Sequence, residues 1–355
     1  MLFIKVFVST VYLVGGLLLI VFTSSINASS GELVDEFKFI DVQPIHRAPP
    51  VYPTSQRRKQ NDGLVELIFM VDEKGSTFEP VVLRSSHKSF ESVALYALTK
   101  YQYSPRIVNG KAVESVQSIR IIFQMENSRN FVSNDFVELY QSSIKTLEEE
   151  PVDLIKASSL ISKMESNKHL NRFSLVHLFL VKFKYVNKFG TNNEKIEAIK
   201  QLLVFERWAT ESKGKVLDNS LAVLVRRNLV NLYIETQRYG DALLAMLNLE
   251  NIDPYAKAAY SESKAKMHEI YYNDQLVSTN IVLTERGYVS VILFKRNFTF
   301  SNIEGQIRTV KLRCRNKFTE LHFNPESDYK IPKSWGTCHI QVIGEVGTSA
   351  QLVQY

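Results

Sequence analysis

The chain has 355 residues, of which 45% are hydrophobic and 23% charged, and its formal net charge is +6. This hydrophobic content predicts a folded rather than a disordered chain, and the length is sufficient for two or three domains. The chain has 43 basic and 37 acidic residues, so the excess of positive charge is small for its length. The basic residues form no stripe interleaved with aromatic residues, and this argues against nucleic-acid binding.

The chain begins with an apolar segment. Val6–Phe22 contains no charged residue and follows Lys5, while acidic residues come soon after it. Its length lies between those of a signal-peptide core and a membrane span. Residues 1–28 are therefore predicted to be either a cleaved signal peptide or a retained anchor, with membrane contact through residues 6–22 if uncleaved. Either way the remainder is exported, and residues 29–48 are predicted to be a linker.

Residues 49–126 show the order strand, strand, helix, strand. Apolar residues alternate from Val65 to Val71, which places them on one face of a strand. A stripe of apolar residues at helical spacing runs from Phe90 to Tyr101, and Pro105 cannot continue that helix. One amphipathic helix on a small antiparallel sheet makes a complete two-layer α/β domain.

This stretch resembles the C-terminal domain of TonB-family energy transducers. The resemblance covers less than a quarter of the chain and rests on an ordered set of short motifs. They are Tyr52-Pro53, Gly63, Val71-Asp72 with Gly75, Ser85-Ser86, Phe90 with Ala94-Leu95, Tyr101-x-Tyr103-x-Pro105 and Asn109-Gly110. In the family, this domain grips a short segment of an outer-membrane transporter through an exposed edge strand, by β-strand addition.

The resemblance implies a function and a set of binding residues. The partner-binding strand would comprise Ser118, Ile119, Arg120, Ile121, Ile122 and Phe123, with Ser118 and Arg120 facing outward. The protein would lie in the periplasm of a Gram-negative bacterium, soluble or anchored in the inner membrane. It would take part in energy-coupled transport. Its partners would be segments of an outer-membrane transporter or other envelope protein, and could include motor proteins of the inner membrane.

Two departures from the family favour an alternative, a cell-envelope scaffold or adaptor that is not coupled to the proton motive force. The apolar N-terminal segment has no His, and the spacer of residues 23–48 is short and contains one Pro. More than two hundred residues follow the TonB-like stretch. They could cover the predicted binding strand.

Residues 131–275 are predicted to be helical. Leu170–Phe189 is apolar on nearly all sides and is expected to be a buried helix rather than a second membrane span. One 34-residue register matches a tetratricopeptide repeat, through Leu229, Tyr233, Tyr239, Ala242, Met246 and Pro254. The region is therefore predicted to be a TPR-like array, and the alternative is an ordinary helical hairpin with Leu and Tyr in its core.

Residues 277–355 carry a strand pattern, which predicts a small β-sandwich or barrel. The chain's two cysteines, Cys314 and Cys338, fall at inward-facing positions of this region. A disulfide is the favoured interpretation in an exported protein, and two buried free thiols are the alternative.

The sequence offers no catalytic motif, and no enzyme activity, cofactor or metal is predicted. His339 beside Cys338 gives no metal-ligand set, and His177 lies in an apolar helix, where a satisfied core histidine is expected. The predicted fold class is therefore α+β: a TonB-like two-layer α/β domain, an all-α TPR-like array and a small all-β domain.

Overall fold

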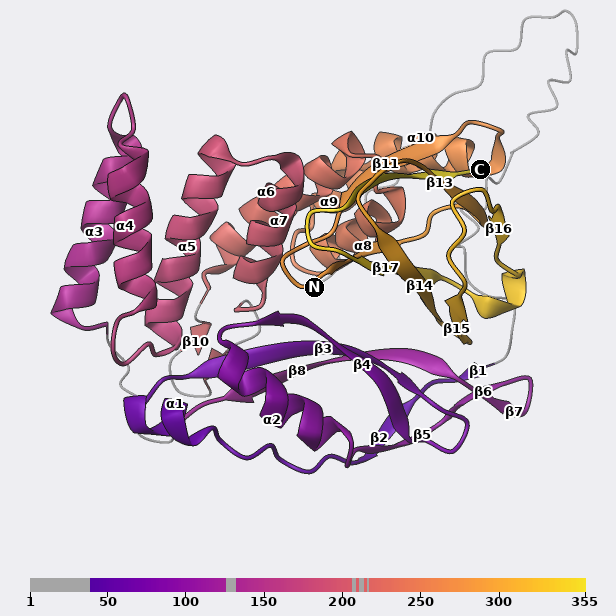
Figure 1. Cartoon of the computed structure of the whole chain (residues 1–355), viewed down its shortest axis with the longest axis horizontal. Coiled ribbons are helices and arrows are strands. Elements are labelled where there is room, and N and C mark those ends of the chain that lie inside the picture. Colours follow the sequence, from indigo (N-terminus) through magenta and orange to yellow (C-terminus); the bar gives the residue numbers. More distant parts are fainter. Residues whose placement is uncertain (1–38, 126–131, 206–208, 211–213, 216) are drawn as a thin grey trace, which may run out of the picture. The chain divides into compact units, whose positions relative to one another are not determined.

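The computed structural model describes residues 39–125, 132–205, 209–210, 214–215 and 217–355 (Figure 1). The predicted signal peptide or anchor lies outside the described residues. The chain is of mixed α+β type, with an N-terminal region of strands and helices (39–125), a helical region (134–272) and a C-terminal β-region (277–354).

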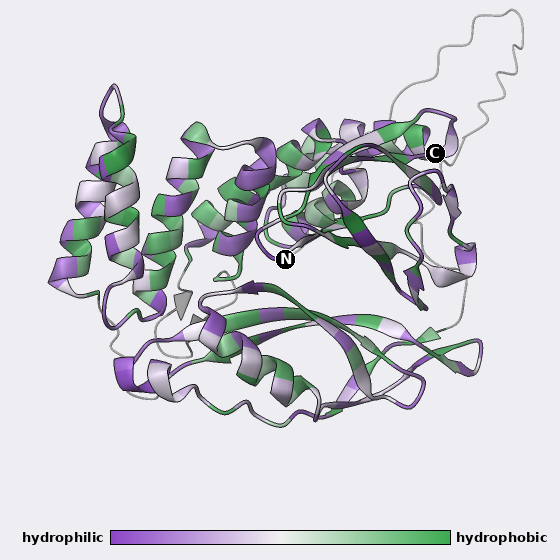
Figure 2. Cartoon of the chain, viewed as in Figure 1, coloured by the Kyte–Doolittle hydropathy of each residue, from purple (hydrophilic) through white to green (hydrophobic). Residues whose placement is uncertain are grey.

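Three antiparallel strands form the main sheet of the N-terminal region, in the order β4-β3-β8. Their bounds are β3 (Gly63–Val71), β4 (Thr77–Ser85) and β8 (Ser115–Phe123). Alternate side chains of β3, from Val65 to Val71, pack with α2 (Lys88–Leu98) in one core, as the period-two pattern predicts. Figure 2 shows β3 as a largely hydrophobic strand, in keeping with its central place in the sheet.

Shorter elements flank this sheet. They are β1 (Phe39–Ile40), β2 (Gln43–His46), α1 (Thr54–Lys59), β5 (Gln102–Ser104), β6 (Arg106–Val108) and β7 (Lys111–Val113). Strand β2 pairs with β5 and β1 with β6, so part of the predicted linker of residues 29–48 is structured. Asn109 and Gly110 turn the chain between β6 and β7 with φ of 49° and 78°, as expected of a tight Asn-Gly turn.

The helical region consists of successive packed helices with one small hairpin. The elements are α3 (Asn134–Glu148), α4 (Leu154–Glu165), α5 (Arg172–Phe189), α6 (Asn192–Leu203), β9 (Ala209–Thr210), β10 (Gly214–Lys215), α7 (Asn219–Glu235), α8 (Tyr239–Glu250), α9 (Ala256–Ala259) and α10 (Ser261–Tyr272). Side-chain oxygens of Asn171, Thr191 and Asp218 accept hydrogen bonds at the starts of α5, α6 and α7. Within the described residues, none of these helices is long and apolar enough to cross a bilayer.

The residues of the tetratricopeptide-like register lie on α7, on α8 and just beyond. Leu229, Tyr233, Ala242 and Met246 are buried in one core. Gln237, which stands where the repeat usually has Gly, has a positive φ of 54° at the turn between the helices. The packing of α7 against α8 agrees with the repeat pattern. An ordinary helical hairpin packs in the same way, so the repeat assignment stays a prediction.

Two four-stranded sheets form the C-terminal β-region and enclose one core. The first has the order β11 (Val277–Val282), β18 (Ser349–Gln354), β13 (Asn297–Glu304), β16 (Tyr329–Lys330), and the second β12 (Tyr288–Ile292), β17 (Cys338–Gly344), β14 (Ile307–Cys314), β15 (Phe318–Leu321). Cys314 and Cys338 face each other across β14 and β17 and form a disulfide, which confirms the predicted pairing.

Candidate protein-binding site

Strand β8, which contains the predicted binding residues, lies at one edge of the main sheet. Its nine residues pair with β3 without a register shift, from Ser115 opposite Val71 to Phe123 opposite Gly63. Among the residues that the structure describes, no further strand pairs with its other side. An edge strand of this length can pair its outer N–H and C=O groups with an extended segment.

The six predicted residues divide between the two faces of the sheet. Ile121 and Phe123 are buried in the core that includes α2, and Ile119 packs against it. Ser118 is exposed and Ile122 is 39% exposed. On their face Arg120 is largely buried and donates to Glu66 over 3.3 Å (Nη2 to Oε1). The strand therefore presents exposed side chains at Ser118 and Ile122, whereas its core residues hold it in place.

The residue just before β8 is held by the C-terminal β-region. The carboxylate of Glu114 accepts from Lys317 Nζ (2.9 Å) and from the backbone N–H of Phe318 (3.0 Å). The ring of Phe318 also contacts Phe78 of β4 edge to face, at a centroid distance of 5.6 Å. These contacts lie at the beginning of the strand, whereas the predicted segment starts at Ser118.

Strand β4, at the opposite edge, carries features that disfavour strand addition. Pro80 has no backbone N–H to donate, and Glu79 before it has a positive φ of 49°. The pairing of β4 with β3 contains two register shifts. The C=O of Val82 already accepts a hydrogen bond from the Tyr288 hydroxyl of β12. Together these features close the β4 edge to a further strand.

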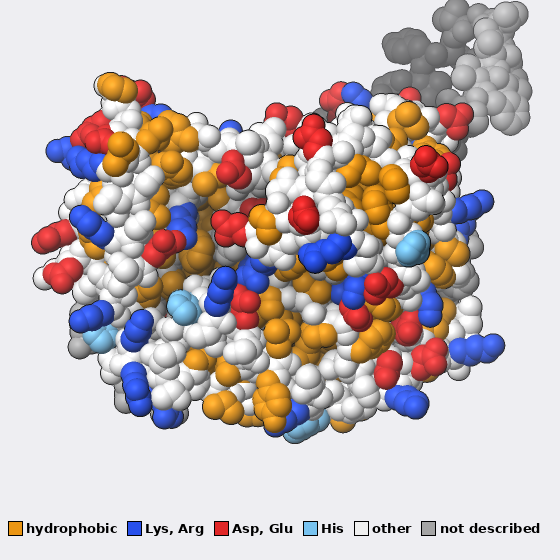
Figure 3. All heavy atoms as spheres, viewed as in Figure 1, with side chains coloured by type: hydrophobic (Ala, Val, Ile, Leu, Met, Phe, Trp, Pro, Cys, Tyr) orange, Lys and Arg blue, Asp and Glu red, His pale blue; other side chains and the backbone are white. Residues whose placement is uncertain are grey.

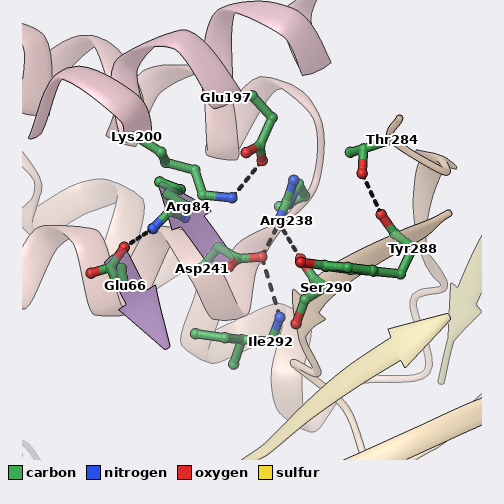
Figure 4. Close-up of polar contacts among 10 residues, drawn as sticks. All are labelled: Glu66, Arg84, Glu197, Lys200, Arg238, Asp241, Thr284, Tyr288, Ser290 and Ile292. Atoms are coloured by element: carbon green, nitrogen blue, oxygen red, sulfur yellow. Dashed lines mark hydrogen bonds and ion pairs between the residues drawn. The ribbon is translucent and has the colours of Figure 1, made fainter. Parts of the chain in front are cut away.

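The face of the sheet opposite α2 carries a cluster of charged side chains (Figure 4). Glu66 of β3 pairs with Arg84 of β4 and with Arg120 of β8. Burial by itself would raise the pKa of the Glu66 carboxyl, but the two guanidinium groups outweigh it and hold that pKa below its ordinary value. The carboxylate therefore joins all three strands on this face.

Charged residues of the helical region extend this cluster. Glu197 and Lys200 of α6 form an ion pair of 2.5 Å. Burial opposes ionisation of Glu197, yet the charges of Lys200 and Arg84 lower its pKa to about 2. Arg238, just before α8, pairs with Asp241 of α8 (3.0 Å) and donates to the C=O of Ser290 on β12 (3.1 Å). Arg84 on the sheet therefore interacts electrostatically with Glu197 of the helical region. The hydrogen bond from Arg238 to Ser290 joins the helical region to the β-region.

The charged cluster was not predicted from the sequence. Glu66 and Arg84 each occupy an alternate strand position, a pattern typical of a solvated face. Pro80, directly before the apolar run Val81–Leu83, is the local signal that could have marked β4 as a protected edge. Nothing local in the sequence marks the contact of Tyr288 with Val82, because the two residues are 206 positions apart.

The described residues contain no group of three or more His, Cys, Asp or Glu side chains arranged to hold a metal ion. Cys338 is engaged in the disulfide, and burial lowers the pKa of the neighbouring His339 imidazole. His177 is partly buried, with Nδ1 lying 2.7 Å from the C=O of Phe173, and its ring contacts Tyr140. The contacts described for His177 and the burial of His339 are those of side chains packed within the fold.

Comparison with known proteins identifies the N-terminal region. Residues 48–125 match the family model described as the Gram-negative bacterial TonB protein C-terminal. Protein TonB of Pseudomonas aeruginosa is 29% identical over 101 residues, which are 28% of this chain and 28% of that protein. The chain thus spans little more than a quarter of the length of the curated relative it matches.

Two solved structures are similar to about a quarter of the chain. The solution structure of the Pseudomonas aeruginosa TonB C-terminal domain shares 28% identity and covers 25% of this chain and 91% of that one, with a TM-score of 0.23. The TonB2 protein of Vibrio anguillarum shares 33% identity and covers 24% and 82%, with a TM-score of 0.21. Residues 48–125 thus match the family model of the TonB C-terminal domain, and the chain shows weak homology to TonB.

Proposed function

We propose that the chain is a TonB-like protein-binding component of the Gram-negative periplasm, and that it takes up an extended partner segment along β8, at Ser118–Phe123. By homology, the partner is a segment of an outer-membrane transporter or another envelope protein. The family match over residues 48–125 supports a transport-related role.

The difference between the two sheet edges carries this proposal. Strand β4 is closed by Pro80, by its register shifts and by the hydroxyl of Tyr288, whereas β8 pairs regularly along its whole length. Natural proteins close edges that would otherwise pair with other chains. In this sheet β4 is closed, whereas β8 is long and regularly paired, so β8 is the edge suited to pairing with a partner strand.

Strand addition makes a specific prediction about backbone groups. In an antiparallel strand without a bulge, successive residues direct their N–H and C=O groups to opposite sides. Every second amide between Ser118 and Phe123 should therefore become protected from hydrogen exchange when a partner segment binds. The remaining amides already pair with β3 and should change little.

A photo-crosslinking amino acid placed at Ser118 or Ile122 tests the proposal in a Gram-negative host. Both side chains are exposed at the edge, and the control position is Tyr96, which is 61% exposed on α2. We expect crosslinks from Ser118 and Ile122 to one extended segment of an envelope protein, and none to that segment from Tyr96. Equal crosslinking from all three positions would contradict strand addition at β8.

A second function, a periplasmic adaptor without energy coupling, is favoured by the packing of the TonB-like sheet. Its face opposite α2 lies against other parts of the same chain, through Leu64 in the helical core and Arg84 near Glu197. Such packing holds the TonB-like domain against the helical region of the same chain, as expected of an adaptor that keeps its binding surfaces in a fixed arrangement.

The fate of the N-terminus distinguishes transducer from adaptor. Energy coupling through inner-membrane motor proteins requires residues 1–28 to be retained as an anchor. We would fractionate a Gram-negative host that expresses the full chain and measure the mass of the mature protein. Intact mass in the inner membrane supports the transducer, and a chain beginning near Ser29 in the soluble periplasm supports the adaptor.

A further inference from the structure

We propose that a groove between β4 and the C-terminal β-region binds a carboxylate-bearing ligand, an acidic peptide segment. The groove has a volume of about 690 Å³, which lies in the range of ligand-binding clefts. One wall is formed by Glu79–Val82 of β4 together with the first turn of α2. The other wall is formed by side chains of β12, β14 and β17 and of the turn before β12.

Positive charge exceeds negative charge in the groove. Its basic side chains are those of Lys88, Arg286, Lys311 and Arg313. The carboxylate of Glu79 is shared by Lys311 (2.9 Å) and Arg313 (3.3 Å). The carboxylate of Glu91 pairs with Arg286 over 2.8 Å, and Lys88 lies one turn before it on α2. Lys311 also lies 3.4 Å from the carboxylate of Glu320 on β15. The groove lining itself holds four basic side chains and three carboxylates, the third being the exposed Glu285.

Arg313 is a built part of this site rather than a mobile surface side chain. It is only 2% exposed, and its Nη1 donates over 2.5 Å to Oε1 of Gln341, which is 4% exposed. Its Nε has no hydrogen-bond partner among the described residues. A buried guanidinium whose closest acceptor is a neutral amide, and whose carboxylate is shared, is incompletely compensated. A ligand carboxylate would supply the missing charge.

The backbone conformation of Glu79 is a further observation at the same place. Its φ of 49° is uncommon for a residue other than glycine. Strained residues of this kind concentrate at ligand-binding and functional sites. Here the conformation accompanies a carboxylate that lies between Lys311 and Arg313.

The shape of the groove favours a peptide over a small free anion. Four consecutive residues of β4 line it, and Pro80, Val81 and Ile343 add apolar surface that can pack against aliphatic parts of a ligand. Carboxylates suit the planar fork of arginine. Since the β4 edge is closed to strand pairing, the ligand would be held by side chains, independently of β8. Figure 3 shows basic and acidic side chains interspersed over the face of the molecule in this view.

Calorimetric titration of the full chain with acetylated, amidated tetraglutamate tests the proposal, with tetraglutamine as the uncharged control peptide. We expect binding of tetraglutamate at low ionic strength and none of tetraglutamine. Arg286→Gln should weaken the affinity about fivefold or more, because it removes a groove cation. Lys266→Gln on α10 removes the same charge outside the groove lining and should leave the affinity unchanged.

Three results would overturn the proposal: equal binding of both peptides, equal affinity of Arg286→Gln and the parent chain, or inorganic phosphate displacing the peptide at equal concentration. If Arg286→Gln fails to fold, Lys88→Gln replaces it, since Lys88 is exposed. Crosslinking from Ser118 in the same variants is the control for the β8 site. Its retention separates failure of the groove from failure of strand addition.

Discussion

Arg172, the first residue of α5, forms a buried ion pair with Asp62, which lies just before β3. Nη1 is 3.6 Å from Oδ2, and the backbone N–H of Arg172 donates to the same oxygen over 3.1 Å. The Asp62 side chain is fully buried, and Oδ1 accepts from the N–H of Met125 just after β8. One carboxylate therefore connects the start of β3 and the end of β8 to the helical region.

Replacing Asp62 by Ala should destabilise the protein severely. The change leaves the buried Arg172 without this carboxylate, and removal of one partner from a buried pair costs about 3–5 kcal/mol. Urea unfolding of the full chain, followed by fluorescence, measures the loss. Asp135→Ala, at an exposed position in the first turn of α3, is the control and should change the unfolding free energy by less than about 1 kcal/mol. Similar values for both variants would contradict this role of Asp62.

Removing the disulfide should also destabilise the protein. Cys314 and Cys338 are 24 residues apart, and a loop of this size predicts a loss of about 3 kcal/mol. Urea unfolding of the Cys314→Ala, Cys338→Ala double variant measures it. Both sulfurs are buried, so reductant should act on the native parent only slowly. If free thiols can be labelled soon after reductant is added to the folded parent, the disulfide is accessible and this expectation is wrong.

Acid should destabilise the charged cluster around Glu66. The pKa of Glu66 is lower in the folded chain than the ordinary value of 4.5, because Arg84 and Arg120 outweigh the effect of burial. The native state therefore binds this proton more weakly than the unfolded state. Its contribution to stability is complete above pH 4.5 and is lost as the pH falls through the folded pKa.

Glu66→Gln provides the test of this pH dependence. As the pH falls below 4.5, the parent should lose stability more steeply than the variant, because the variant has one fewer carboxyl with a lowered pKa. Urea unfolding at a series of pH values gives the slopes. Glu138→Gln, at an exposed position of α3, is the control and should keep the parent slope. Parallel curves for the parent and Glu66→Gln would exclude the cluster as the source.

Gly240, near the start of α8, should not accept a side chain. A Cβ at this position would lie 2.5 Å from the C=O oxygen and 2.9 Å from Cγ2 of Ile292 on β12. Gly240→Ala should therefore cost about 1–3 kcal/mol, although alanine favours helices. Thermal unfolding measures the change, and Ser142→Ala at an exposed position of α3 is the control. An unchanged or raised midpoint for Gly240→Ala would show that the helix and strand can separate without cost.

The sequence predicts those parts of the fold that depend on local patterns. The alternation around Val65, the helical stripe from Phe90 and the Asn109-Gly110 turn each reflect backbone geometry that repeats over a few residues. The cysteine pair was also predictable, because an exported chain with two inward-facing cysteines favours a disulfide.

The relations between distant segments could not be predicted. The pairing of Asp62 with Arg172 and of Glu91 with Arg286 joins residues far apart in the chain, and neither carboxylate has a local signature. The tertiary fold brings these charges together, and a single sequence does not contain that information in a readable pattern. For the same reason, the closure of β4 by Tyr288 appears only in the structure.

The unequal edges of the TonB-like sheet also limit how far pairing can proceed. A sheet that accepts strands at both edges can extend without end, as fibrils do. Because β4 is closed by Pro80 and by the Tyr288 hydroxyl, a strand that pairs with β8 finds no second growing edge on the same sheet. If β8 takes up a strand as proposed, growth of the sheet would therefore be limited to that one side, whether the added strand comes from a partner or from a second copy.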